Sequence, residues 1–204
     1  MDLLYRFLKV IVRAIFFSIF RVKIIGKENL NFSGKMIIYS NHVAAIDPIF
    51  IHCMLDRMPK FMAKKELFKN KFVAWLITKL GAFPVDRGHT DMNAIKSAFR
   101  VLNNGEILGI FPEGRRTTDG NMGKFMPGAA LIALRANAPM LPMYISRRMK
   151  PFCRTYFIVG KPFYVKDKLE SAKLSDPDSM IDATEVIKRE IYLLKDQADK
   201  LCQK

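Results

Sequence analysis

Short apolar segments alternate along most of the chain with longer segments of helical character. Six apolar segments are typical of strands: 35–40 (KMIIYS), 60–63 (KFMA), 81–85 (GAFPV), 106–111 (EILGIF), 139–145 (PMLPMYI) and 155–160 (TYFIVG). Helices are predicted over 48–55, 67–80, 92–103, 127–137 and 178–201. This alternation predicts an α/β fold, in which helices cover a sheet. With 204 residues, half of them hydrophobic, the chain can form one domain with a sizeable core.

The first 23 residues (MDLLYRFLKVIVRAIFFSIFRVK) precede this alternation. The longest uncharged run in their second half, AIFFSIF, is too short for a bilayer span of about 20 residues. On a helical wheel, Asp2, Arg6, Lys9 and Arg13 fall within roughly 60° of arc. This pattern predicts an amphipathic helix over 1–23 that lies in a membrane interface with its cations toward the headgroups. The alternative is a helix packed on the core of the domain formed by 24–204.

The formal net charge is +15 at pH 7, which predicts an anionic partner such as a membrane surface, a nucleic acid or an acidic protein. Nucleic acid is disfavoured, because the basic residues are spread out and no motif interleaves them with stacking aromatics. The three cysteines have no C-x-x-C spacing, which indicates a reducing compartment. Three cysteines and three histidines give little from which to build a metal site, so no metal is expected.

Polar clusters recur directly after four of the apolar segments. In open α/β sheets, ligands bind at the carboxyl ends of the strands. We therefore expect these clusters to form one site, made from His42 and Asp47 after 35–40, Lys64 after 60–63, Arg87 after 81–85, and Glu113, Gly114, Arg115 and Arg116 after 106–111.

The first cluster, in SNHVAAIDPIF, has the residue types of an acid–base pair. A neutral imidazole can take a proton from a hydroxyl group, and a carboxylate behind it would hold its tautomer. The spacing of His42 and Asp47 permits this contact. Asp47 followed by Pro48 is also a typical helix N-cap and first-turn pair. No G-x-S-x-G motif supplies a nucleophile, so direct transfer to a substrate hydroxyl is favoured over a covalent enzyme intermediate.

The segment FPEGRRT predicts a phosphate-binding turn. Pro112 and Gly114 force the chain to turn after the strand, and the turn presents backbone N–H groups next to guanidinium groups. Arg87 and Lys64 are candidates for two further contacts with the phosphate. For each of these cations, a solvated or ion-paired surface residue is the alternative.

Four blocks, NHVAAID, GAFPVDR, FPEGRR and APMLPMYI, occur in an order that resembles the glycerolipid acyltransferases of the 1-acylglycerol-3-phosphate acyltransferase family. The segment AKKELF is similar to a further segment of that family. The resemblance extends from about residue 26 to about residue 166. It implies an α/β fold with a mixed central sheet and helices on both faces, so that 24–204 would be the acyltransferase domain.

The resemblance also implies a reaction. A fatty acyl group would pass from acyl-CoA or acyl carrier protein to the sn-2 hydroxyl of 1-acylglycerol-3-phosphate, giving phosphatidic acid, with no cofactor or metal. The residue matching the family's base is His42, and Asp47 matches the aspartate that orients it. The positions matching its phosphate-binding residues are Lys64, Arg87 and Arg116, with Glu113 and Gly114 shaping the turn. The N-terminal helix and the cysteine usage, and not the resemblance, predict a peripheral location at the cytoplasmic face of a membrane with anionic lipids.

Two departures from the family pattern bear on the substrate. Arg115 stands where many relatives have threonine, so Arg115 is the alternative to Arg116 as a phosphate ligand. The residues after Asn41–His42 are Val-Ala-Ala rather than polar, which leaves the acceptor headgroup open. Another lysophospholipid or hydroxylated lipid is an alternative acceptor. A non-catalytic protein that binds anionic lipid at the membrane surface is the alternative from a different class.

Overall fold

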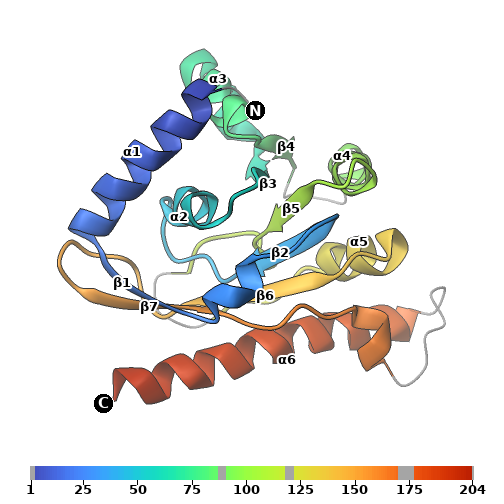
Figure 1. Ribbon diagram of the computed structural model, residues 1–204. Helices are drawn as coiled ribbons and strands as arrows, with labels where there is room; N and C mark the ends of the chain where they lie inside the picture. Colours follow the sequence, from blue (N-terminus) through green and yellow to red (C-terminus); the bar gives the residue numbers. More distant parts are fainter. Residues whose placement is uncertain (1–2, 87–90, 118–121, 170–176, 204) are drawn as a thin grey trace.

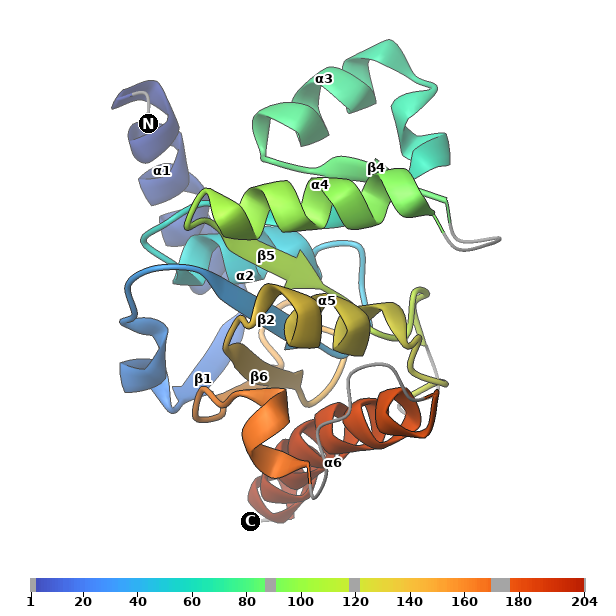
Figure 2. The same cartoon turned by 90° about the vertical axis from the view of Figure 1, so that its right-hand side faces the viewer.

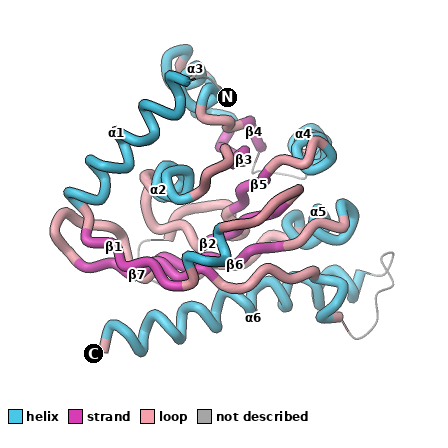
Figure 3. Tube along the Cα trace, in the orientation of Figure 1, coloured by secondary structure: helices cyan, strands magenta, loops and turns pink. Residues whose placement is uncertain are grey.

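The computed structural model describes residues 3–86, 91–117, 122–169 and 177–203. Its centre is a mixed seven-stranded sheet in the order β1-β7-β6-β2-β5-β3-β4 (Figure 3). The strands are β1 (Arg21–Ile25), β2 (Met36–Ser40), β3 (Pro59–Lys64), β4 (Phe83–Val85), β5 (Ile107–Ile110), β6 (Met140–Ile145) and β7 (Arg154–Val159). The strands β2 to β6 are parallel to one another, whereas β7 is antiparallel to β6 and pairs in parallel with the edge strand β1.

Helices cover both faces of the sheet (Figures 1 and 2). They are α1 (Leu3–Ile19), α2 (Asp47–Met54), α3 (Lys71–Lys79), α4 (Met92–Asn103), α5 (Gly128–Ala136) and α6 (Pro177–Cys202), with the 3₁₀ helices η1 (Lys27–Leu30), η2 (Lys65–Phe68) and η3 (Val165–Lys168). Figure 1 shows α1 and α2 on one face, and α4, α5 and α6 on the other. Both faces of the central strands are therefore covered, and every residue of β2, β5 and β6 is buried.

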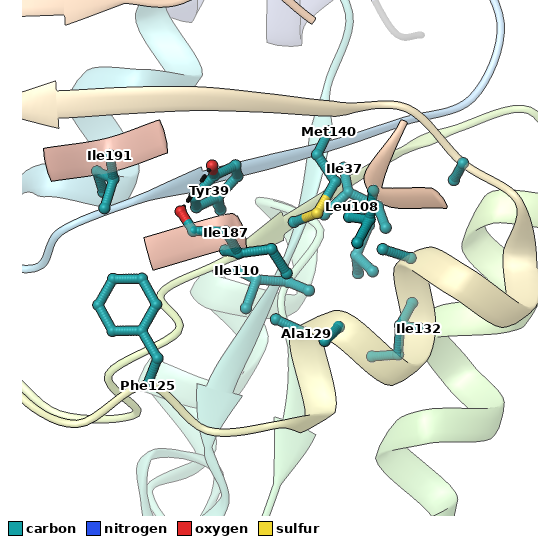
Figure 4. Close-up of a cluster of buried hydrophobic side chains, with 14 of the residues drawn as sticks. Ile37, Tyr39, Leu108, Ile110, Phe125, Ala129, Ile132, Met140, Ile187 and Ile191 are labelled. Carbon is teal, nitrogen blue, oxygen red and sulfur yellow. Dashed lines mark hydrogen bonds between the residues drawn. The ribbon is translucent and has the colours of Figure 1, made fainter. Parts of the chain in front are cut away.

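Alternate residues of β2 enter different parts of the core, as the two-residue period of a strand requires. Ile37 and Tyr39 pack with α4, α5 and α6, whereas Met36 and Ile38 pack with α1 and α2. On the first of these faces, the Tyr39 hydroxyl donates a hydrogen bond to the Ile187 carbonyl of α6 at 3.1 Å (Figure 4). The strand that precedes His42 is thus fixed from both sides.

The predicted fold class and the six predicted strands are confirmed. The strand β1 is not predicted, because Arg21–Ile25 alternates charged and apolar residues and follows an apolar helix without a turn signal. The predicted helix 67–80 is instead η2 followed by α3. The break lies at Asn70, whose side-chain oxygen accepts hydrogen bonds from the backbone N–H groups of Phe72 and Val73 and so caps α3.

One basic residue of the N-terminal helix α1 does not face the direction that the sequence predicts. The Lys9 ammonium group donates a hydrogen bond to the Leu55 carbonyl at the end of α2. Burial lowers the pKa of Lys9. Lys9 thus faces the protein, and the expectation that it faces lipid headgroups is wrong. The ring of Phe16 is buried and stacks on Phe50 at 5.1 Å, whereas Val10 and Ile15 are exposed. Among the described residues, no helix is both long enough and apolar enough to cross a bilayer.

Candidate active site

The candidate acid–base pair lies in the loop between β2 and α2, at the carboxyl edge of the parallel strands. The Nδ1 atom of His42 lies 3.0 Å from Oδ2 of Asp47. Both residues are buried. Since Nδ1 is directed at the carboxylate, Nε2 is the nitrogen available to a substrate hydroxyl. The contact that the spacing permits is therefore present in the folded chain.

The Asp47 carboxylate holds the loop as well as the imidazole. Its Oδ2 atom accepts hydrogen bonds from the backbone N–H groups of Val43 and Ala44, both at 2.7 Å. The prediction that Asp47 is the N-cap of α2 is wrong: Asp47 is the first helical residue, and no side chain caps this helix. The aspartate turns back toward the preceding loop because that loop curls tightly enough to present two N–H groups. These two bonds and the contact with Nδ1 of His42 all involve the same carboxylate oxygen, so the loop fixes the carboxylate relative to the imidazole.

An aromatic stack supports the His42 ring from one side. The ring lies 4.1 Å from that of Phe111 at an interplanar angle of 19°, and Phe111 in turn stacks on Phe61 at 5.5 Å. Phe61 can approach β5 only because residue 109 is glycine, since a Cβ atom there would lie 2.3 Å from the ring. The apolar segments at 60–63 and 106–111 predict core strands, but they do not indicate that two of their aromatics align under the histidine.

Glu113 connects the two loops of the site. Its Oε1 atom accepts a hydrogen bond from the backbone N–H of His42 at 3.2 Å, and Oε2 accepts one from Gly123 at 2.7 Å. The backbone N–H of Thr117 donates to the carbonyl of His42 at 2.9 Å. Gly114 adopts a φ of 65°, in the left-handed region that favours glycine. The buried Glu113 carboxylate thus faces the backbone of the site, an inward orientation suited to shaping the turn.

Asn41, which sequence reasoning left without a role, joins the site to the neighbouring strand. Its side-chain oxygen accepts a hydrogen bond from the Ile145 N–H at 2.8 Å, and its side-chain nitrogen donates to the Ile145 carbonyl at 2.9 Å. These bonds tie the end of β2 to the end of β6. The signal in the sequence is an amide residue directly after an apolar strand, where no paired strand can continue the backbone ladder.

The basic residues expected to bind phosphate are less constrained. Lys64, the last residue of β3, is exposed, and its ammonium group lies 3.8 Å from the Glu66 carboxylate. Arg115 and Arg116 follow β5 and are also exposed. Since β3 and β5 are parallel neighbours, these residues emerge at the same edge of the sheet as His42. Arg87 lies outside the described residues.

A second buried histidine, His52, has different surroundings. It lies in the last turn of α2. Burial, followed by the positive charges of Lys9 and Lys60, lowers the pKa of His52 to about 4. A histidine that stays neutral beside cations is not suited to accept a proton near neutral pH. In the described part of the chain, no group of three His, Cys, Asp or Glu side chains could hold a metal ion.

These features place a histidine–carboxylate pair and several cations at the carboxyl edge of a mixed α/β sheet. Residues 21–146 match the family described as Acyltransferase. The chain therefore belongs to the acyltransferase family, as the order of its four blocks predicts.

Individual relatives indicate which members of the family this chain resembles. The chain is 32% identical to the 1-acyl-sn-glycerol-3-phosphate acyltransferase of Bacillus subtilis (strain 168), over 88% of this chain and 91% of the relative. It is 29% identical to the chloroplastic 1-acyl-sn-glycerol-3-phosphate acyltransferase BAT2 of Brassica napus over 62% of this chain, but only 38% of that longer protein is covered. A crystal structure of the 1-acyl-sn-glycerophosphate acyltransferase PlsC from Thermotoga maritima matches 92% of this chain and 77% of that chain, with a TM-score of 0.65 and 25% identity. The mixed sheet with helices on both faces is thus shared with a solved relative.

Proposed function

We propose that this protein transfers a fatty acyl group from an acyl thioester to the sn-2 hydroxyl of 1-acylglycerol-3-phosphate, giving phosphatidic acid. The observation that carries the proposal is the buried contact of 3.0 Å between His42 and Asp47, in a chain of the acyltransferase family. The acceptor is inferred from the relatives, which are named for this substrate. A non-catalytic lipid-binding protein would have no use for this pair.

In the proposed reaction, Nε2 of His42 takes the proton of the acceptor hydroxyl as its oxygen attacks the thioester carbonyl carbon. Asp47 stabilises the imidazolium that forms. The tetrahedral intermediate then collapses and the carbon–sulfur bond breaks. The leaving thiolate takes the proton from His42, so that the products are the ester and a free thiol. Loop backbone N–H groups are the expected donors to the oxyanion.

The phosphate of the acceptor is proposed to bind Lys64, Arg87 and Arg116, with Arg115 able to share the contact of Arg116. Their role is to hold the hydroxyl against Nε2, and positioning of this kind lowers the barrier without chemistry of its own. Glu113 and Gly114 contribute indirectly by shaping the turn that carries the two arginines. The exposure of Lys64, Arg115 and Arg116 supports the proposal, since a lipid headgroup must reach them from the surface.

The acyl donor is proposed to be acyl-CoA or acyl carrier protein, used as co-substrate with no resident cofactor. Both donors are anionic, and the net charge of +15 would attract either of them as well as anionic lipid. The proposed location is the cytoplasmic face of a membrane, with the protein bound peripherally. The exposed apolar side chains of α1 support this location.

The direct experiment measures phosphatidic acid formed from lysophosphatidic acid in detergent micelles, with acyl-CoA and acyl carrier protein compared as donors. Product formation with at least one donor is expected, and the preferred donor is identified by its kcat/KM. Lysophosphatidylglycerol and lysophosphatidylcholine serve as competing acceptors. A higher kcat/KM for either of them would contradict the proposed headgroup.

The phosphate contacts are tested separately through KM. Arg116→Ala and Lys64→Ala are expected to raise KM for lysophosphatidic acid by roughly ten-fold each, the value of one charge-assisted contact, with kcat little changed. Lys188→Ala, in α6, is the matched control. An unchanged KM in both site variants would remove these residues from the site.

A further inference from the structure

The short helix α3 and the preceding η2 expose several large apolar side chains. Phe72 and Trp75 are 70% and 59% exposed, and their rings stack on each other with centroids 6.2 Å apart. Leu76 in the same helix and Leu67 in the preceding η2 are also exposed, at 43% and 47%. We use the name aromatic patch for these four residues. Large apolar side chains scattered singly on a surface are common, but here four lie in one ten-residue segment, and two of them stack on each other.

The composition of α3 does not fit a helix in water. Its sequence, KFVAWLITK, is mostly apolar, its polar residues being Lys71, Thr78 and Lys79, and a helix this apolar normally buries one face. Yet none of its residues is buried. Val73 and Ile77 are partly covered, whereas Phe72, Trp75 and Leu76 are exposed.

Lysines flank the aromatic patch. Lys71 and Lys79 stand at the two ends of α3, and Lys69 lies in the preceding turn. All three are exposed, and in the described part of the chain their ammonium groups form no ion pair. Apolar and aromatic residues surrounded by lysines match the boundary between the acyl chains and the anionic headgroups of a bilayer. Each lysine near such a surface strengthens binding roughly five-fold.

The position of α3 connects the patch to the site. The chain enters η2 directly from the carboxyl end of β3, and Lys64 is the last residue of that strand. The patch therefore follows the sheet edge at which His42 lies. In both views, α3 and the N-terminal part of α1 occupy the end of the molecule away from α6 (Figures 1 and 2).

We propose that the aromatic patch of η2 and α3 is a membrane-docking surface that inserts into the interface of a bilayer containing anionic lipids. This inference deepens the proposed function, on which it rests, by assigning a second membrane contact beside the entrance to the site. Lipid substrate would then reach His42 without crossing water. A second copy of the chain is the less suitable occupant, because its lysines would face lysines of the same charge.

The chain offers its own reporter, because Trp75 is its only tryptophan. The experiment records Trp75 fluorescence of the full chain with vesicles of phosphatidylcholine alone, and with vesicles that also contain phosphatidylglycerol. The expected result is a shift of emission to shorter wavelength with the anionic vesicles. Lipids brominated on their acyl chains are expected to quench this emission.

Variants separate the patch from the rest of the surface. Phe72→Ser keeps the reporter and is expected to weaken partition into anionic vesicles roughly ten-fold, as the loss of one buried aromatic predicts. Leu193→Ser is the matched control, because Leu193 is similarly exposed (56%) but belongs to α6 at the opposite end. Partition of the control is expected to equal that of the wild type.

Three results would overturn the proposal. The first is sedimentation with vesicles without any change in Trp75 emission, which would assign binding to α1 or another surface. The second is the absence of vesicle binding altogether. The third is a blue shift that depends on protein concentration without lipid, with a dimer mass in light scattering. None of these would disprove acyl transfer, which is measured independently with short-chain substrates that stay dissolved as monomers.

Discussion

A buried histidine lies near each end of α2, and the charges beside the two rings have opposite signs. His42 precedes the helix and contacts the Asp47 carboxylate through Nδ1. His52 lies in the last turn, where burial and the charges of Lys9 and Lys60 lower its pKa to about 4. Burial alone therefore does not distinguish a candidate base from a structural histidine. The sign of the charge beside the ring does, because a carboxylate stabilises the imidazolium and a lysine destabilises it.

The groups around His42 are also held in fixed positions. Asp47 is fixed by two backbone N–H groups from its own loop, and the imidazole is fixed by the ring of Phe111. This arrangement is preorganised, so little reorganisation is needed when a proton moves. The first two predictions below change the surroundings of His42, and the third replaces His52.

Among these changes, Asp47→Asn is expected to have the largest effect. The amide keeps the size of the side chain but removes the charge that stabilises the imidazolium, so kcat should fall by about 10²- to 10⁴-fold. The measurement is kcat for acyl transfer to lysophosphatidic acid, with folding checked by circular dichroism. Asp56→Asn, near the other end of the helix, is the matched control. A folded Asp47→Asn protein with kcat within ten-fold of the wild type would contradict the claim that the carboxylate distinguishes His42 from His52.

Glu113→Gln is expected to have the next largest effect. One of the two carboxylate oxygens that accept backbone hydrogen bonds becomes an NH₂ group, which faces a buried N–H donor. The free energy of unfolding should fall by about 1–3 kcal/mol in urea denaturation. The exposed Glu66→Gln is expected to change it by less than about 0.5 kcal/mol. Equal values for the two variants would show that Glu113 does not hold the site together.

The smallest effect concerns stability in acid. His52 has a lowered pKa in the folded chain, so between about pH 6.5 and pH 4 the unfolded chain binds the extra proton. Its contribution to stability is complete above pH 6.5 and is lost as the pH falls toward 4. At pH 5 this loss is about 2 kcal/mol. The free energy of unfolding of His52→Gln should therefore depend less on pH over this range, and parallel curves for both proteins would contradict the assignment.

The fold could be predicted wherever the residues of a single segment indicate whether that segment is buried. The run KMIIYS reads as a buried strand, and the structure buries all five residues of β2. β1 could not be predicted, because its alternating charged and apolar residues become a strand only by pairing with β7, more than 100 residues later in the chain. The break between η2 and α3 has a local signal in Asn70, since asparagine is a common helix cap.

The contacts of the candidate site likewise divide into local ones, which the sequence indicates, and long-range ones, which it does not. The His42–Asp47 contact spans five residues, a separation that permits the contact. The hydrogen bond from the backbone of His42 to Glu113 spans 71 residues, and the approach of Phe61 to Gly109 depends on how two strands align. Such contacts depend on the register of the sheet, which no single segment encodes. The phosphate-binding roles of Lys64, Arg87 and Arg116 stay predictions that the KM measurements test.

The central claim is that His42, and not the equally buried His52, is the base that activates the acceptor hydroxyl. The most direct measurement compares initial rates of phosphatidic acid formation for the wild type, His42→Ala and His52→Ala, with lysophosphatidic acid and the preferred donor. We expect His42→Ala to lower kcat by at least about 100-fold and His52→Ala to stay within a few-fold of the wild type. A folded His42→Ala protein with the kcat of the wild type would contradict the account.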